Sequence, residues 1–165
     1  MSLKVAFVVI VGLAIVAFFI FRSSDDNVLE TDGGMVTVGD MSKLVSSLKA
    51  SGSNGSFAVV LVPGTAGSDG YDANLQFSIA NEKVGFDWVL LAERNIKDKE
   101  KVISLAKSNG MSCVSGTMNE VNFVRCSGRD EYAELGQKVL KEIYGVSSNQ
   151  EMPLIITDFV WDKKT

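Results

Sequence analysis

The chain has 165 residues, a formal net charge of −4 and no histidine. Without histidine, hydrolytic triads that need an imidazole base and metal sites with histidine ligands are excluded. All 20 acidic residues but only 14 of the 16 basic residues follow Arg22. This acidic balance argues against nucleic-acid binding and against adhesion to anionic lipid head groups.

The first element in the chain is an apolar run. Val5–Phe21 holds seventeen residues with no charge and no side-chain hydrogen-bonding group, between Lys4 and Arg22. A helix of this length covers roughly 25 Å, near the lower limit for crossing the hydrocarbon of a bilayer. We therefore expect residues 1–22 to form a single-pass transmembrane signal-anchor that contacts the lipid bilayer through Val5–Phe21. A cleaved signal peptide, a lipoprotein or a buried helix fits less well, since the run lacks a small-residue cut site, a following cysteine and a polar face.

The charges beside the run favour one orientation. The amino terminus and Lys4 outweigh Arg22, which predicts a cytoplasmic amino terminus and a carboxy-terminal domain in a periplasmic or extracellular space. Residues 23–34 are polar and acidic and end in two glycines, as is typical of a flexible linker, although an ordered loop on the domain remains an alternative. Residues 35–165 are sufficient for one soluble domain with a single core.

The remaining elements follow from the spacing of apolar residues. Short or alternating apolar runs predict strands, and the continuous run over 57–62 predicts a central one. Repeats at helical spacing predict three helices, each bounded by capping residues or glycine. The expected strands cover 35–38, 57–62, 74–79, 86–92, 111–117, 121–127 and 152–160, and the expected helices follow Asp40, follow Asn95 and cover 130–144. This order predicts an α+β fold, a mostly antiparallel sheet with about three helices on one face.

The glycine-rich loop over 63–72 is the first candidate site. A phosphate loop would need a following helix, whereas a strand is predicted here. Calcium is the better functional interpretation, with Asp69, Asp72 and Asn74 as candidate ligands, but the spacing lacks the Asp-x-Asp ladder and its distal Glu. A surface loop without metal is therefore the expectation, and no catalytic residue or cofactor is predicted.

Two further segments have ordinary explanations. The charged run over 93–101 is typical of a solvated helix start, with a partner surface as the alternative. Phe86, Trp88 and Phe159 fit core positions better than an aromatic binding patch, while Trp161 precedes a charged end.

Cys113 and Cys126 are the only cysteines. A two-residue hairpin loop at Asn119 and Glu120 would place them directly opposite each other, in a non-hydrogen-bonded pair. We expect a disulfide, with buried thiols or a redox couple left as alternatives.

The function expected from these features is that of a membrane-anchored, outward-facing, non-enzymatic binding or assembly domain of the cell envelope, with an envelope protein as a possible partner. The alternative is a thiol-redox or carboxylate-based enzyme on the same anchored domain.

Overall fold

The computed structural model describes residues 33–64, 70–118, 120–128 and 131–162. The predicted anchor over 1–22 lies outside the described residues, as does the predicted linker except for Gly33 and Gly34. Within the described ranges, no helix has both the length and the apolar character that crossing a membrane requires.

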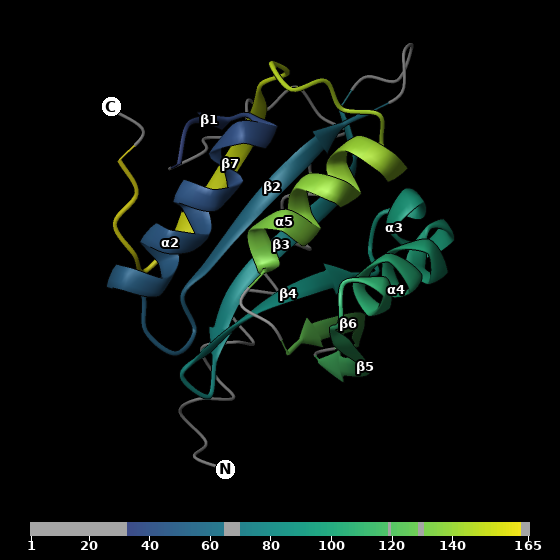
Figure 1. Ribbon diagram of the computed structural model, residues 1–165, viewed down its shortest axis with the longest axis horizontal. Coiled ribbons are helices and arrows are strands. Elements are labelled where there is room, and N and C mark those ends of the chain that lie inside the picture. Colours follow the sequence, from purple (N-terminus) through teal and green to yellow (C-terminus); the bar gives the residue numbers. More distant parts are fainter. Residues whose placement is uncertain (1–32, 65–69, 119, 129–130, 163–165) are drawn as a thin grey trace.

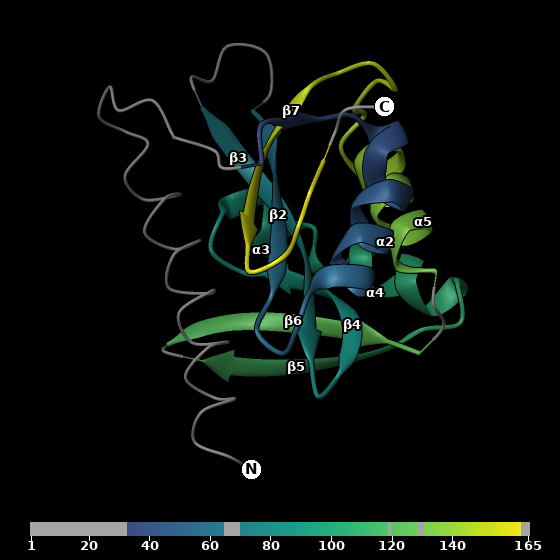
Figure 2. The same ribbon diagram turned by 90° about the vertical axis from the view of Figure 1, so that its left-hand side faces the viewer.

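Seven strands form one sheet in which every neighbouring pair is antiparallel, in the order β1-β7-β2-β3-β4-β6-β5. Figure 2 shows the twist of this sheet, since β5 and β6 run across the direction of β2. The strands are β1 (Met35–Val36), β2 (Phe57–Pro63), β3 (Tyr71–Ala80), β4 (Lys83–Val89), β5 (Ser112–Met118), β6 (Val121–Ser127) and β7 (Met152–Thr157).

Four α-helices accompany the sheet in the described part of the chain: α2 (Met41–Ser51), α3 (Glu93–Lys97), α4 (Lys99–Ser108) and α5 (Tyr132–Lys138). Helices α2, α4 and α5 lie together on one side of the sheet (Figure 2), while α3 lies at one end of the strands beside α4 (Figure 1). The predicted α+β class, antiparallel sheet and order of elements are therefore confirmed.

The main core lies between the sheet and the helices α2, α4 and α5. Alternate residues of β2 divide between two clusters, because successive side chains of a strand point to opposite faces. Ala58, Val60 and Val62 join the main core with α2 and α5. A smaller cluster on the other face contains Phe57, Val59, Leu61 and Ile155. Strand β2 is thus apolar and buried on both faces, as its continuous apolar run predicts.

Several element boundaries differ from the prediction for local reasons. Strand β1 ends at Val36, because the next turn forms a 3-10 helix, η1 (Val38–Asp40), instead of a longer strand. The Asp40 carboxylate accepts hydrogen bonds from the Thr37 backbone N–H (2.7 Å) and hydroxyl (2.9 Å), so Asp40 closes a capping box that starts at Thr37.

Two helices also differ from the prediction. The helix expected after Asn95 is divided at Asp98 into α3 and α4, and Asn95 lies inside α3. The helix expected over 130–144 begins as α5 and continues as a π-helix, η2 (Val139–Ile143). The backbone N–H of Tyr144 donates to the Val139 carbonyl at 3.3 Å, five residues earlier, and Gly145 ends the helix with a φ of 67°.

The sheet begins slightly before the predicted domain start. Gly33 donates its backbone N–H to the Leu154 carbonyl at 3.2 Å, and the N–H of Leu154 donates to the Gly34 carbonyl at 2.8 Å. These last two residues of the predicted linker therefore pair with β7.

Candidate functional site

A line of polar side chains crosses the sheet on the face away from α2, α4 and α5. Gln76 of β3 lies opposite Asp87 of β4, and Asp87 lies opposite Arg125 of β6. Asn74 and Ser78 flank Gln76 on the same face, two residues away on either side. We call these five residues the polar row. Because four of them are buried, the row is the most unusual polar feature among the described residues.

Arg125 is the centre of the polar row. One of its terminal nitrogens, Nη1, lies 2.8 Å from both carboxylate oxygens of Asp87 and donates to Ser78 Oγ at 2.9 Å. The Ser78 hydroxyl in turn donates a short hydrogen bond to the Asp87 carboxylate. The charged and hydroxyl groups of these three residues therefore satisfy one another, which is the condition for tolerating a buried ion pair.

Gly85 provides the space that this arrangement needs. A Cβ atom at Gly85 would lie 2.5 Å from the Arg125 guanidinium carbon, so the side chain of Arg125 passes directly over this glycine. The other terminal nitrogen of Arg125 donates to the Lys83 carbonyl at 3.2 Å. Gly85 lies within β4, where its lack of a side chain leaves room for the arginine.

The electrostatic balance at Asp87 is dominated by burial. Burial raises the pKa of the Asp87 carboxyl above its usual value, and the charge of Arg125 and the hydrogen bond from Ser78 offset only part of that effect. The ionised form is thus held by specific partners in an environment that opposes charge.

At the other end of the polar row, Asn74 and Gln76 have side-chain atoms that form no hydrogen bond. Both side-chain atoms of the Asn74 amide and the Oε1 atom of Gln76 are buried without a hydrogen-bond partner. Asn74 and Gln76 lie opposite Leu61 and Val59 of the smaller apolar cluster. A buried polar group without a partner costs about 1 to 3 kcal/mol, so this part of the sheet contains polar groups that lower stability.

Asn95 joins the ends of β3 and β4 beside the polar row. Its amide nitrogen donates to the Asn74 carbonyl (2.9 Å) and the Val89 carbonyl (2.8 Å), and its oxygen accepts from the Asn74 backbone N–H (3.0 Å). The Asn95 carbonyl also accepts from the indole N–H of Trp88 at 2.8 Å. Asn95, the expected helix start, therefore holds β3 and β4 together through hydrogen bonds from its side-chain amide and its carbonyl.

The structure describes two of the three candidate calcium ligands, Asp72 and Asn74. Asp69 is outside the described residues, and Asp72 forms an ion pair with Arg94 at 2.6 Å. Asn74 is buried in the polar row. In the described ranges, no group of three or more histidine, cysteine or acidic residues is placed to hold a metal ion.

The aromatic residues lie in the core, as expected. Phe86 and Trp88 are fully buried and their rings stack 6.1 Å apart. Trp161 is partly buried against the same core, and Lys43 lies 5.7 Å from its ring centre. From the charged run, Arg94 reaches inward over the ring of Tyr144 at 4.2 Å, so this part of the run is not simply solvated.

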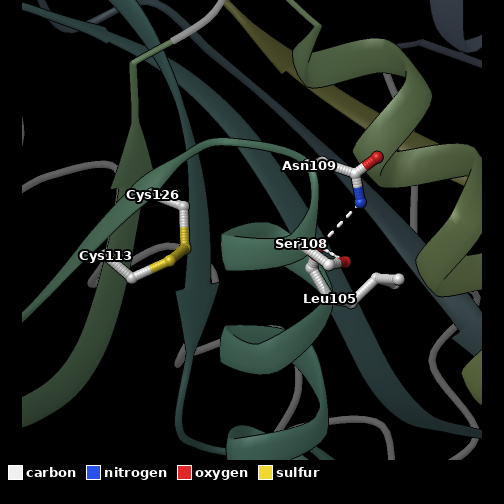
Figure 3. Close-up of a disulfide and its surroundings, with 5 residues drawn as sticks. All are labelled: Leu105, Ser108, Asn109, Cys113 and Cys126. Atoms are coloured by element: carbon white, nitrogen blue, oxygen red, sulfur yellow. Dashed lines mark hydrogen bonds between the residues drawn. A yellow bond between two sulfur atoms is a disulfide. The ribbon is translucent and has the colours of Figure 1, made fainter.

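The two cysteines meet as the hairpin register predicts. Cys113 and Cys126 are direct partners in the β5–β6 ladder, and their sulfur atoms are 2.03 Å apart, the distance of a disulfide. Figure 3 shows the bridge beside the end of α4, where the Leu105 carbonyl accepts hydrogen bonds from the side chains of Ser108 and Asn109. Cys126 is completely buried, so one sulfur of the bridge is closed to solvent.

An open cavity of about 590 Å³ lies between the carboxyl end of α2 and the β3–β4 turn. Its lining includes Lys49, Asn54, Lys83 and Tyr132. The backbone N–H of Glu82 donates to the Asn54 side chain at 2.7 Å and fixes the β3–β4 turn against this cavity. The cavity has a polar lining without a buried charged group, so nothing in it selects a particular ligand.

No protein-family model matches this chain, and neither a curated protein nor a solved structure was found to match it. The fold is that of an α+β domain with a seven-stranded antiparallel sheet.

Proposed function

We propose that this protein is a membrane-anchored, outward-facing binding or assembly component of the cell envelope. The anchor is the apolar run Val5–Phe21, which has the length and composition of a single-pass transmembrane helix. The domain that follows supplies a seven-stranded antiparallel sheet, which suits a component that presents a surface to another protein.

The observation that carries the outward orientation is the cysteine pair. Disulfides form and persist in oxidising compartments and are rare in the cytosol. Because the register of β5 and β6 holds Cys113 and Cys126 at bonding distance, the fold is suited to an oxidising space beyond the membrane. The charges beside the apolar run, the amino terminus and Lys4 against Arg22, favour the same orientation.

The polar row offers no free charged group for catalysis. Its charged groups, Asp87 and Arg125, are engaged with each other and with Ser78, so none of the three is poised to act on a substrate. Cys126 is completely buried, so only the half-buried Cys113 is open to attack from solvent, which supports a structural bridge over a thiol-redox couple.

Membrane insertion is tested on the full chain with Val11→Lys and the matched control Val11→Leu. A charge at the centre of the run should move the protein from the carbonate-resistant membrane fraction to the supernatant, whereas the apolar control should remain in the membrane. If Val11→Lys stays in the membrane, the run is not the anchor.

Orientation is tested by labelling a cysteine introduced at Ser24 or at Ser2. We expect a membrane-impermeant maleimide to label the Ser24 position in intact cells and the Ser2 position only after permeabilisation. The reverse pattern would place the domain in the cytoplasm and would contradict the proposed function.

Catalytic redox activity is tested by treating the folded full-length protein with a mild thiol reductant. A bridge with a structural role should resist mild thiol reductants while the protein is folded, and it should be reduced after unfolding. Rapid reduction of the native protein would favour the redox alternative.

A further inference from the structure

Strand β5 is an edge strand that differs from most edges in natural sheets. It pairs with β6 on one side only and is the last strand in the sheet order, as Figure 2 shows. The edge strand at the other end, β1, has only two residues, whereas β5 has seven. The long edge is therefore the one that can accept another strand.

The free backbone groups of β5 follow from its register. The Asn122 carbonyl accepts from the Leu90 N–H of β4 at 2.9 Å, so the backbone of Asn122 faces β4 and not β5. Thr117, its partner in β5, consequently faces the free edge. With a period of two, Ser115 and Cys113 face the same way, which leaves three N–H and three carbonyl groups pointing outward.

Among the residues that the structure describes, none of the usual protections covers this edge. Ser112–Met118 contains no charged residue and no proline, and its pairing with β6 runs without a bulge. Ser112, Ser115 and Thr117 are exposed, and Val114 is 69% exposed. Natural sheets protect such edges with lysine, proline or bulges because an unprotected edge pairs with other chains.

We propose that β5 pairs with β5 of a second copy of this protein, antiparallel, across a two-fold axis at Ser115. In this register Ser115 lies opposite its own copy, and Cys113 lies opposite Thr117 on each side of the axis. Every outward N–H meets an outward carbonyl, so all three outward residues of each copy are paired. A shift of two residues in either direction loses one of the three pairs.

The side chains of β5 favour a second copy as the occupant. At a two-fold axis any charged residue meets its own copy, and like charges directly opposite each other are destabilising. The absence of charge over all seven residues therefore permits self-pairing. The disulfide to β6 also fixes the strand in its extended form before association.

A specific apolar contact accompanies this register. Val114 of one copy would lie opposite Gly116 of the other. The ring of Phe123 occupies the space above Gly116, since a Cβ there would lie 2.7 Å from Phe123 Cζ. The exposed Val114 side chain of one copy would thus lie beside the Phe123 ring of the other copy.

The proposal is tested on the full chain in non-ionic detergent by light scattering after size-exclusion chromatography. Ser115→Lys places two charges on the axis and should weaken the dimer at least about tenfold in dissociation constant, while the uncharged, matched control Ser115→Thr should remain dimeric. Ser115→Pro removes the outward N–H without breaking the pairing with β6 and should act like Ser115→Lys. Thermal melting confirms that each variant is folded.

A diazirine-bearing residue at position 114 tests the register. Mass spectrometry should find it crosslinked to the segment 116–123 of a second copy. A monomeric wild type, a dimer unaffected by both Ser115→Lys and Ser115→Pro, or a crosslink to another protein would overturn the proposal. These outcomes do not depend on the anchor or on the orientation of the domain.

Discussion

The Cα atoms of Cys113 and Cys126 lie 4.0 Å apart, at directly opposed positions of β5 and β6. The two-residue hairpin loop after Met118 determines this relationship, because it fixes which residues oppose each other along the whole ladder. The cysteine positions are therefore compatible with a bridge in the folded chain without any rearrangement of the backbone.

We expect the bridge to stabilise the domain by about 2 to 4 kcal/mol. Cys113→Ser should lower the free energy of unfolding by that amount under oxidising conditions and should have little effect when the wild type is also reduced. Denaturant titration with and without reductant measures both values. Two free thiols in the intact mass of protein exported to an oxidising compartment would contradict the prediction.

Leu140→Ala and Leu135→Ala should each cost about 2 to 5 kcal/mol of stability. Both side chains are completely buried between the helices and the sheet, and truncation leaves a cavity in the main core. Val160→Ala is the matched control, since Val160 is 72% exposed and should change stability by about 0.5 kcal/mol or less. Losses below about 1 kcal/mol at both leucines would show that this face is not core.

Gly136→Ala should destabilise the domain by about 1 to 3 kcal/mol although alanine favours helix formation. The added Cβ would lie 2.7 Å from Phe77 Cζ, inside the contact distance of two carbon atoms. Gly39→Ala tests whether the effect is local, because the nearest atom to a Cβ at Gly39 is 3.6 Å away. Thermal unfolding of the two variants gives the comparison, and equal effects would disprove close packing at Gly136.

Asp87→Asn should change how stability depends on pH. Since burial raises the pKa of Asp87, the folded state holds this proton more tightly than the unfolded chain does. The stability that this tightly held proton contributes is therefore fully present below the unfolded pKa of about 3.9. It is lost as the pH rises through the folded pKa. Relative to Asp87→Asn, the wild type should lose stability as the pH rises above about 4.

The pH comparison has a control and a contrary outcome. Glu120→Gln removes one negative charge from an exposed position and corrects for the change in net charge. Denaturant midpoints across the acidic range provide the data. If the wild type instead gains stability over Asp87→Asn as the pH rises, the ion pair with Arg125 outweighs the burial of the carboxylate.

The sequence by itself determined the order and type of the elements, the antiparallel character of the sheet and the register of the cysteine hairpin. These properties depend on local patterns: the period of apolar residues, the residues that cap helices, and the length of a turn. The continuous apolar run in β2 also indicated a strand buried on both faces.

Only the tertiary structure decided which polar residues come together. Ser78, Asp87 and Arg125 lie on three different strands. They meet because β6 pairs with β4 as well as with β5, its neighbour in sequence. Asn95, which looked like a cap, pairs with backbone groups of β3 and β4 for the same reason. Strand order depends on the summed packing of all elements, so no local pattern contains it, and the polar row and the free edge of β5 appear only once that order is known.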